Sequence, residues 1–338
     1  MEIRENFNLK PYHTFHTDVR TRYWATATHP EEAAELKARF GHLRTLFLGE
    51  GSNVLFLQDF DGIIIRNEIK GIDVIKRTPS YEIWEIGGGE NWHEVVRQSV
   101  NAGVSGIENL ALIPGKAGTA PVQNIGAYGR EIKDVLIDCD VLDTETGKFL
   151  TLSASECRFG YRHSLFKEPS VKGRYFIYKI RLKLIPGGRP ETEYASLQAY
   201  LKQKGITRPG IRDVFNAVTA IRRQKLPDPQ EIGNAGSFFK NPVVGSETFE
   251  ALYRKHPDVV YYPTGKGRYK IPAAWLIDRA GWKGYREGDA GVHPRQAVVL
   301  VNYGRASGQD IYRLSEKIIE DIRNKFDIIL EREVQIIS

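Results

Sequence analysis

Residues 109–129 limit the possible folds of this chain more than any other part of the sequence. They read Asn-Leu-Ala-Leu-Ile-Pro-Gly-Lys-Ala-Gly-Thr-Ala-Pro-Val-Gln-Asn-Ile-Gly-Ala-Tyr-Gly, and the four glycines and two prolines exclude a regular helix or a long strand. An irregular connection of this length is unusual inside a compact domain unless it has a function. Apart from Lys116 the stretch is uncharged but rich in amides and hydroxyls, so its backbone N–H groups could surround a large, partly anionic ligand. An ordered surface loop fits the composition equally well.

A second glycine-rich segment, Leu-Gly-Glu-Gly-Ser-Asn at 48–53, lies upstream. It differs from a dinucleotide-binding fingerprint because the third glycine is missing. The apolar residues 54–57 that follow predict a strand, so no helix N-terminus is available to receive a pyrophosphate. This excludes a Rossmann site. A turn between two apolar strands could still present its amides and the Ser52 hydroxyl to a phosphate.

Length, charge and cysteine content indicate which classes of protein this chain can belong to. A chain of 338 residues predicts two or three domains. The net charge of +6 comes from 48 basic and 42 acidic residues that are interleaved, which argues against nucleic acid as a partner and suits an anionic small molecule. No apolar run has membrane-spanning length, and the N-terminus lacks the form of a signal peptide. Cys139 and Cys157 fit no metal spacing, so we expect reduced thiols, no metal site and a cytoplasmic location.

Hydrophobic periodicity and Gly/Pro punctuation predict alternating short strands and helices. Helices are predicted at 30–40, 92–102, 212–224, 246–256, 272–279 and 309–326, with a further short one between 189 and 210. Strands are predicted at 45–48, 54–57, 62–66, 81–86, 135–143, 148–152, 175–184 and 328–337. The segment 144–147 predicts a hairpin turn. The first three strands and the first helix are expected to form one small α/β unit, and the glycines after Pro186 suit a domain boundary.

Three polar groupings stand outside simple core patterning. Arg162 lies among aromatic residues at 159–164, where it could pair with a carboxylate or phosphate, although a surface salt bridge is the commoner explanation. Basic residues at 222–225 precede a rigid Pro-Asp-Pro turn, and basic residues are also common at the end of a helix.

Ser237 lies between a glycine turn and two phenylalanines, with no neighbouring histidine or lysine to activate it. It could donate a proton to a strongly basic carbanion, or it could be an ordinary turn serine.

A fourth grouping is the terminal Leu-Glu-Arg-Glu-Val at 330–334. In a half-buried strand, Glu331 and Glu333 share one face and Arg332 takes the other. A buried carboxyl group is costly unless it is paired or has a task. The pattern alone does not choose between the two glutamates.

Together these motifs resemble one family, the UDP-N-acetylenolpyruvoylglucosamine reductases. The matching blocks follow the family's order and spacing along nearly the whole chain, at 49–53, 109–129, 159–162, 225–229, 233–242, 290–296 and 330–334. The resemblance implies an α+β fold, with a two-subdomain FAD-binding module of the PCMH/vanillyl-alcohol-oxidase type and a C-terminal α/β substrate-binding domain. The corresponding ranges are 1–71 and 72–188 for the two FAD-binding subdomains, 189–220 for a connecting segment, 221–327 for the substrate-binding domain and 328–338 for a terminal strand carrying Glu333.

The resemblance also implies the reaction. NADPH would reduce a noncovalently bound FAD, and hydride from the flavin N5 would then reduce the enolpyruvyl group of UDP-N-acetylglucosamine enolpyruvate, giving UDP-N-acetylmuramate for peptidoglycan. By analogy, Arg162 and Glu333 support the enolate and Ser237 protonates the adjacent carbon. A monomer that binds neither nucleic acid nor membrane is expected.

Further residues are carried over by the resemblance. Positions that contact substrate are Tyr161, Tyr194, Lys225, Asn241, Tyr262, Lys270 and Gln296. Positions that contact flavin are Gly49, Gly51, Ser52, Asn53, Thr119, Gln123, Gly126, Ala127 and Arg222. Tyr194 lies in the extra segment of the family's longer subclass, where it caps the nucleotide. One departure is Thr119-Ala120, where some members carry two consecutive hydroxyl residues, so a contact that needs the second hydroxyl must be lost, replaced by water or never essential.

Two other functions remain open from the sequence. One is an oxidase or dehydrogenase on the same FAD scaffold, which would require a base near N5 and often a covalent flavin. The other is a nucleotide-binding or nucleic-acid-binding protein without catalysis, suggested only by the excess of basic residues.

Overall fold

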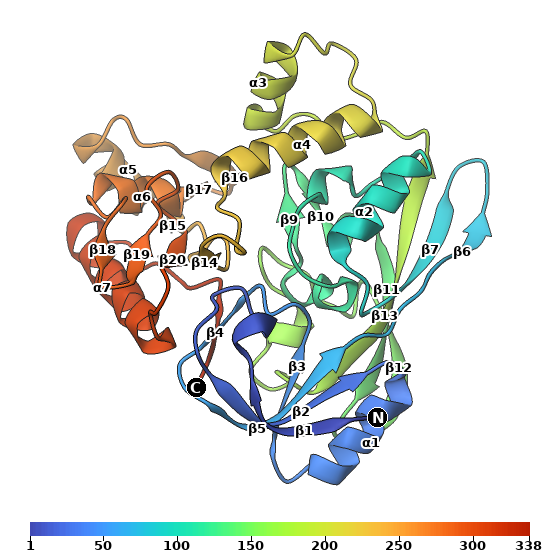
Figure 1. Cartoon of the computed structure of the whole chain (residues 1–338). Coiled ribbons are helices and arrows are strands. Elements are labelled where there is room, and N and C mark those ends of the chain that lie inside the picture. The colour runs from blue at the N-terminus through green and yellow to red at the C-terminus, as the bar shows by residue number, and fades with distance from the viewer. The chain divides into compact units, whose positions relative to one another are not determined.

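A computed structural model describes residues 1–338, and these divide into two compact units (Figure 1). The larger unit comprises Met1–Phe7, Thr21–Glu50 and Asp61–Gln224. The smaller unit comprises Asn8–Arg20, Gly51–Phe60 and Lys225–Ser338. Each unit therefore combines segments that are distant in the sequence.

The first sheet has the strand order β1-β2-β5-β3. Its strands are β1 (Ile3–Asn8), β2 (Arg20–Ala27), β5 (Phe60–Asn67) and β3 (Arg44–Leu48), and β3 runs parallel to β5. Helix α1 (Pro30–Phe40) begins at a proline and has Glu32 in a capping box, as expected for a helix start. Its buried face packs with the isoleucines of β5 in one hydrophobic cluster. The helix predicted at 30–40 is confirmed.

A larger antiparallel sheet forms the centre of the same unit. Its strand order is β12-β11-β13-β7-β6, and the short β8 (Val104–Ser105) also pairs with β13. The strands are β12 (Lys148–Ser153), β11 (Leu136–Asp143), β13 (Tyr175–Pro186), β7 (Glu82–Gly87) and β6 (Ile72–Arg77). Asp143 pairs with Lys148 across the β11–β12 turn, which confirms the predicted hairpin.

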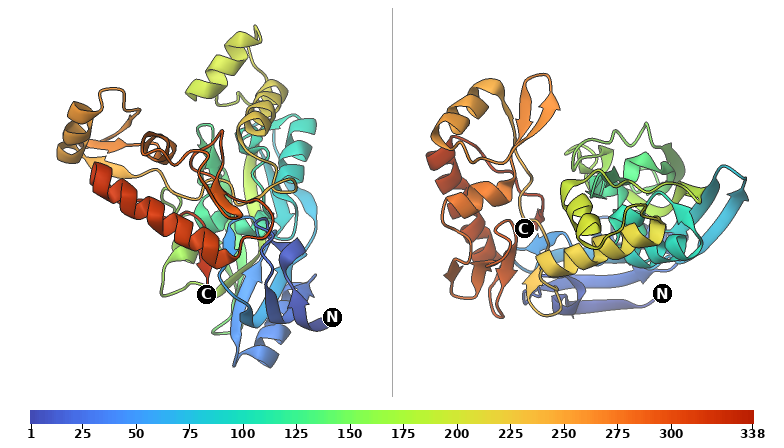
Figure 2. Two further views of the ribbon diagram at one scale, coloured as in Figure 1. Left: turned by 60° about the vertical axis from the view of Figure 1, so that its left-hand side comes forward. Right: turned by 90° about the horizontal axis from the view of Figure 1, so that it is seen from above.

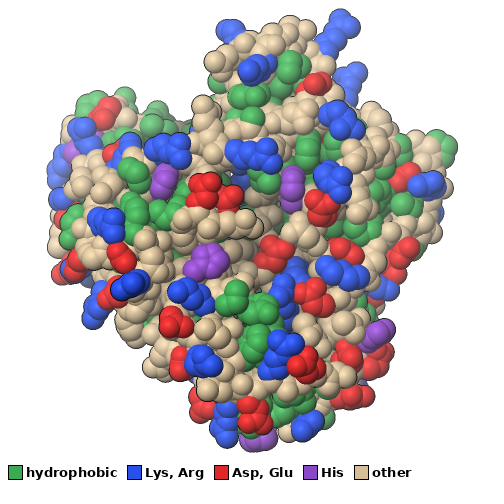
Figure 3. Space-filling view, in the orientation of Figure 1, with side chains coloured by type: hydrophobic (Ala, Val, Ile, Leu, Met, Phe, Trp, Pro, Cys, Tyr) green, Lys and Arg blue, Asp and Glu red, His purple; other side chains and the backbone are tan.

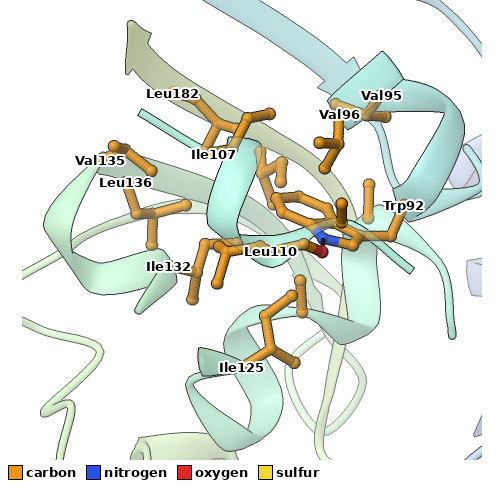
Figure 4. Close-up of a cluster of buried hydrophobic side chains, with 14 of the residues drawn as sticks. Trp92, Val95, Val96, Ile107, Leu110, Ile125, Ile132, Val135, Leu136 and Leu182 are labelled. Carbon is orange, nitrogen blue, oxygen red and sulfur yellow. Dashed lines mark hydrogen bonds between the residues drawn. The ribbon is translucent and has the colours of Figure 1, made fainter. Parts of the chain in front are cut away.

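Helix α2 (Trp92–Asn101) links this sheet to the glycine-rich loop. Asn91 caps it by accepting the Glu94 N–H, as its position before the helix favours. Trp92 lies in the middle of the largest hydrophobic cluster, where its indole N–H donates to the Leu110 carbonyl at 3.1 Å (Figure 4). The start of the loop is thereby fixed to the core, because a buried carbonyl must keep its hydrogen bond.

Two more helices complete the larger unit, α3 (Ala195–Gln203) and α4 (Ile211–Lys225), whose last residue falls in the smaller one. Apolar residues of both helices join the hydrophobic cluster of Trp92. The His93 ring of α2 stacks on Phe215 of α4 with their centroids 5.6 Å apart. Helix α4 is therefore packed on the face of the unit that carries the loop.

The smaller unit has a sheet of order β14-β20-β19-β18 against the long helix α7 (Gly308–Phe326), which Figure 2 shows clearly. Its strands are β14 (Gly233–Asn234), β20 (Leu300–Asn302), β19 (Ala290–Val292) and β18 (Arg286–Glu287). A second sheet, β15-β17-β16, packs on α5 (Ser246–Lys255), while α6 (Ala273–Arg279) packs on α7. The strands of this second sheet are β15 (Val243–Gly245), β17 (Arg268–Lys270) and β16 (Tyr262–Gly265).

The sequence does not predict β1, β2, β6 or the short strands of the smaller unit, and two strands that it does predict differ in the structure. The strand predicted at 54–57 is β4 (Val54–Phe56), but it does not join the α/β unit of its sequence neighbours; it pairs in parallel with β21 (Gln335–Ile337) in the smaller unit. The strand predicted at 328–337 is only β21, and residue 332 makes an isolated bridge to Phe239. Alternation of apolar residues reveals extended backbone but not the partner to which it bonds.

Side chains of both charges are interspersed over the face drawn in Figure 3, as the interleaved sequence predicts. No helix combines the length and the apolar character needed to cross a bilayer.

Candidate functional site

The glycine- and proline-rich loop is ordered by short turns rather than by a long element. It contains the 3₁₀ turns Glu108–Leu110, Ala117–Thr119 and Pro121–Gln123, and then β9 (Gly126–Ala127), which pairs with β10 (Arg130–Glu131). Asn124 has a left-handed conformation and is fully buried, and its side chain binds the Gly160 carbonyl at 3.0 Å and Glu131 at 3.0 Å. The predicted flavin contacts Thr119, Gln123, Gly126 and Ala127 all lie in this loop.

The loop lies in contact with the central sheet. The Gly118 N–H donates to the Gly88 carbonyl at 2.9 Å, and a Cβ added to Gly118 would lie 2.5 Å from the Ile177 carbonyl oxygen of β13. No other residue type fits there without a backbone shift. Glycine is therefore required at 118 by close approach to the sheet.

The two glycine-rich segments of the sequence meet in the larger unit. A Cβ on Gly49 would lie 2.8 Å from the Thr119 methyl carbon. The adjacent Glu50 carboxylate accepts the Asn91 amide at 2.6 Å and the Gly115 N–H at 3.0 Å. Sequence reasoning did not single out Glu50, although it belongs to the 49–53 block, because its role depends on a partner 65 residues away.

The other flavin candidates of the upstream segment belong to the smaller unit. Gly51 is buried, and Ser52 and Asn53 are half-buried. Asn53 donates its side-chain amide to the Glu333 carbonyl at 3.2 Å, and its own carbonyl accepts the Gln335 N–H at 2.9 Å. These bonds fix the turn to the C-terminal segment.

Arg162 is held by the loop through its guanidinium group. Nη2 donates to the Gly126 carbonyl at 2.7 Å, and the group lies 5.4 Å from the Tyr161 ring centroid. Arg162 itself has a left-handed backbone, with φ +50°. The structure therefore brings three predicted site residues, Tyr161, Arg162 and Gly126, together.

Arg222 supplies a second, unusual positive charge. Its Nε is buried without a hydrogen-bond partner, and no carboxylate pairs with it. Burial lowers the pKa of this guanidinium, Tyr128 opposes the shift, and the positive charge of Arg162 adds to it. Such an arrangement is costly unless an anion or another acceptor binds there.

Tyr194 lies beside the end of the loop. Its half-exposed ring meets that of Tyr128 edge-on, with centroids 5.3 Å apart. The buried Asn109 amide donates to the Tyr128 carbonyl at 2.8 Å and to the Glu191 carbonyl at 2.9 Å. Asn109 therefore attaches the segment before Tyr194 to the glycine-rich loop.

Ser237 follows a left-handed Gly236 and is exposed, while Phe238 and Phe239 after it are fully buried. Its hydroxyl makes no hydrogen bond within the chain. The Phe238 carbonyl accepts the Glu333 N–H at 2.8 Å, so the serine and Glu333 segments are directly bonded.

The two candidate glutamates differ in their surroundings. Glu331 is exposed and pairs with Lys240 at 2.9 Å, whereas Glu333 is half-buried. Arg332 turns toward α7, where its Nε donates to Ser315 at 2.9 Å and its guanidinium pairs with Glu316. The two glutamates therefore differ in burial, and the choice of Glu333 stays a prediction.

The remaining substrate candidates lie in the smaller unit. Asn241 accepts the first N–H of α6, from Ala273, at 2.9 Å, which leaves its amide NH₂ for another partner. Tyr262 pairs with Lys270 across the β16–β17 ladder. Gln296 is half-buried and Lys225 is exposed at the end of α4.

The residues present fit a large cofactor with hydrogen-bonding and anionic groups. The unpartnered Nε of Arg222, the unpartnered amide oxygen of buried Asn109 and the absent Cβ atoms at Gly49 and Gly118 all lie on or next to the loop. A flavin dinucleotide has a diphosphate and a ring system with acceptors and donors that match these groups.

Comparisons with known proteins match two parts of the chain to known domain families. The family model for an FAD-binding domain matches residues 23–153, and that for the C-terminal domain of UDP-N-acetylenolpyruvoylglucosamine reductase matches residues 228–337. The chain is 42% identical to the reductase of that name from Flavobacterium johnsoniae over 100% of both chains. It is 46% identical to that of Burkholderia multivorans, over 96% of this chain and 94% of the relative.

A solved structure shares the fold. The crystal structure of UDP-N-acetylenolpyruvylglucosamine reductase from Thermus caldophilus superposes with a TM-score of 0.68 at 24% identity, and the match covers 100% of this chain and 98% of that one.

The close approach at Gly118 generates a testable prediction. Gly118→Ala places a methyl group 2.5 Å from the Ile177 carbonyl oxygen, so the loop must shift away from the sheet. We expect the purified variant to retain about tenfold less flavin than the unmodified protein, measured as the ratio of flavin to protein absorbance. Gly210→Ala, whose added carbon meets Asp213 at an ordinary 3.6 Å, is the matched control. Equal flavin content in both variants would contradict the interpretation.

Proposed function

Because this chain belongs to the UDP-N-acetylenolpyruvoylglucosamine reductase family, we propose that it reduces UDP-N-acetylglucosamine enolpyruvate to UDP-N-acetylmuramate with NADPH as reductant. The chain is a flavoprotein oxidoreductase of peptidoglycan precursor synthesis, and the matched domain indicates FAD. The fold prediction is confirmed as α+β, with a PCMH-type FAD-binding module and the C-terminal domain of this family. The cytoplasmic location, the monomeric state and the predicted domain bounds remain predictions.

The observation that carries the proposed chemistry is the state of Ser237. Its exposed hydroxyl is bonded to no histidine, lysine or carboxylate, so nothing in the chain activates it as a base or nucleophile. Its segment is instead bonded through Phe238 to the segment of Glu333. A neutral hydroxyl is suited to give a proton to a strongly basic carbon, as the reduction of an enolpyruvyl group requires.

Each proposed catalytic group then has a distinct task. Bound FAD supplies the hydride that NADPH provides. As negative charge develops on the enolpyruvyl carboxylate, Arg162 stabilises the enolate by donating hydrogen bonds to it. The Gly126 carbonyl accepts a hydrogen bond from the same guanidinium and so orients it. Glu333 holds the enolate form by hydrogen bonding, which requires its carboxyl group to be protonated at that stage. Ser237 delivers its proton to the adjacent carbon and recovers one from solvent, to which it is exposed.

Substrate recognition is assigned to the cations, amides and tyrosines carried over by resemblance. Lys225, Lys270 and the free donor of Asn241 suit a diphosphate and a carboxylate, and Tyr161, Tyr262 and Gln296 complete the proposed set. Arg222 and the loop residues are assigned to the flavin. The Asn109 amide donates to the Glu191 carbonyl and so fixes the segment that carries Tyr194 to the loop. This hydrogen bond supports the proposal that Tyr194 caps the nucleotide, as in the family's longer subclass.

An anaerobic colour experiment tests the function. Purified protein should be yellow, lose its colour with NADPH, and regain it without oxygen when UDP-N-acetylglucosamine enolpyruvate is added. Recovery of colour only on admission of oxygen would favour an oxidase on the same scaffold. Protein that never binds flavin would favour a nucleotide-binding role without catalysis.

The role of Ser237 can be separated from flavin reduction. Ser237→Ala should leave the bleaching by NADPH near its normal rate but slow the substrate-dependent recovery of colour by about 10²–10⁴-fold, because only the second half-reaction uses that proton. Ser246→Ala, which removes an exposed serine in the same unit, is the control and should leave both rates near normal. Equal slowing of the two half-reactions in Ser237→Ala would count against the assignment.

Tyr194 generates a prediction for substrate binding. Tyr194→Ala should raise the KM for the nucleotide substrate about tenfold with little change in kcat. The reason is that contact between the tyrosine ring and a bound base or ribose contributes about 1–2 kcal/mol to binding. Tyr285→Ala removes a tyrosine of similar exposure in the smaller unit and should leave KM near normal. An unchanged KM in Tyr194→Ala would remove Tyr194 from the site.

A further inference from the structure

Lys116 is the charged residue of the glycine-rich loop, and its side chain is almost completely buried, with 3% exposed. Its ammonium group donates to the Asn67 carbonyl at 2.6 Å and pairs with Glu68 Oε1 at 2.5 Å. Asn67 is the last residue of β5, in the first sheet of the larger unit, and Glu68 follows it directly. The side chain thus connects the loop to a different sheet from the one that Gly118 contacts.

The attachment point is itself rigid. Asn67 is buried, and its amide donates to the Ile177 carbonyl of β13 at 2.9 Å while its oxygen accepts the Ile69 N–H at 3.2 Å. That amide nitrogen lies 3.1 Å from where a Gly118 Cβ would be and 2.6 Å from where a Gly88 Cβ would be. Lys116 is therefore bound at the point where the two sheets and the loop come together.

The other end of Lys116 fixes two proposed flavin contacts. The Thr119 hydroxyl donates to the Lys116 carbonyl at 2.8 Å and accepts the Lys116 N–H at 3.2 Å. The Lys116 Cβ lies 3.5 Å from where a Gly49 Cβ would be. A change in the position of Lys116 would therefore move Thr119 and the surface against which Gly49 packs.

Stability alone does not explain a buried lysine at this position. Burial lowers the pKa of Lys116 to about 8, against the opposing effect of the Glu68 carboxylate. Replacing a buried ion pair by apolar side chains of similar volume is often neutral or stabilising. The charge is thus expected to have a task that an apolar residue would not perform.

We propose that Lys116 is a positioning residue for FAD, whose ammonium group holds residues 116–119 against the end of β5 so that Thr119 and Gly49 are placed for the cofactor. The proposal rests on the flavin contacts assigned to those two residues in the proposed function. It predicts that FAD affinity depends on the ammonium group even though Lys116 itself need not touch the flavin.

The charged groups around Lys116 determine how its effect varies with pH. Glu68 faces it from the end of β5 and also binds Arg66 at 2.7 Å, while Lys70 lies 3.7 Å from Glu68 and 3.8 Å from Glu90. Arg66 and Lys70 both lower the pKa of Lys116. Below about pH 8 the ammonium is charged and the pair with Glu68 is intact; above that pH the proton is lost and the attachment weakens. FAD affinity should therefore fall as the pH rises through about 8.

The test is FAD binding by the apoprotein, followed through the quenching of flavin fluorescence from about pH 6.5 to about pH 9.5. Lys116→Met keeps most of the side-chain volume and removes the ammonium. We expect its FAD dissociation constant at neutral pH to be about tenfold higher than that of the unmodified protein, and nearly independent of pH. The unmodified protein should approach the same weak affinity at the alkaline end.

Two controls make the result decisive. Lys70→Met removes a half-exposed lysine near the same carboxylate but outside the loop, and should leave FAD affinity within about twofold. Because Glu68 keeps its ion pair with Arg66 in Lys116→Met, the melting temperature of the apo variant should fall by no more than about 8 °C and the protein should stay folded at the assay temperature, which separates loss of positioning from loss of folding. A dissociation constant for Lys116→Met close to that of the unmodified protein, or the same pH dependence in both, would overturn the proposal. Because neither NADPH nor the nucleotide substrate is present, this outcome is independent of which reaction the enzyme performs.

Discussion

The close contact between the Ala117–Thr119 turn and the strands beneath it is the constraint on which the larger unit depends. The Gly118 N–H reaches the Gly88 carbonyl, and no side-chain atom fits between that glycine and the Ile177 carbonyl of β13. The sheet can approach the loop so closely because both surfaces are backbone. A loop held in this way can turn its remaining N–H groups toward a ligand without the entropy loss that ordering a flexible loop would cost on binding.

Charge is distributed unevenly between the proposed functional groups. The larger unit supplies guanidinium groups, one held by a loop carbonyl at Arg162 and one left without an acid partner at Arg222. The smaller unit supplies the uncharged hydroxyl of Ser237 and the carboxyl group of Glu333 on two segments that are bonded through their backbones. The proposed electrophilic groups and the proposed proton donor therefore belong to different units of the chain.

The sequence predicted most helices and the main hairpin, because helix caps, hydrophobic periodicity and turn residues determine structure within a few neighbouring positions. Helix α1 has its proline and glutamates where they were expected, and the turn after Asp143 closes as predicted. Partner choice could not be predicted in the same way. Strand β4 bonds to β21 across most of the sequence, and nothing in its apolar residues indicates that partner. The same limit applies to Glu50, whose carboxylate binds Gly115 only because the chain folds back.

The comparison of Glu331 with Glu333 shows why the pattern left that choice open. A regular strand would have placed both on one face, but the segment extends beside Phe239 through a single bridge and becomes regular only at Gln335. Without a continuous ladder the alternation is lost, so one glutamate is exposed and the other half-buried. Here burial and backbone bonding distinguish two residues that the sequence pattern treats as equivalent.

The departure at Thr119-Ala120 can be explained by the same kind of argument. The Ala120 methyl is buried in the hydrophobic cluster around Trp92, and its N–H is bonded to the Ala117 carbonyl. A hydroxyl at that side chain would need a partner within an apolar cluster, where an unsatisfied polar group is costly. The Thr119 hydroxyl, by contrast, is half-exposed and already bonds both backbone groups of Lys116. In this chain the second hydroxyl is therefore unnecessary for the shape of the loop, since Thr119 and Lys116 maintain it between them.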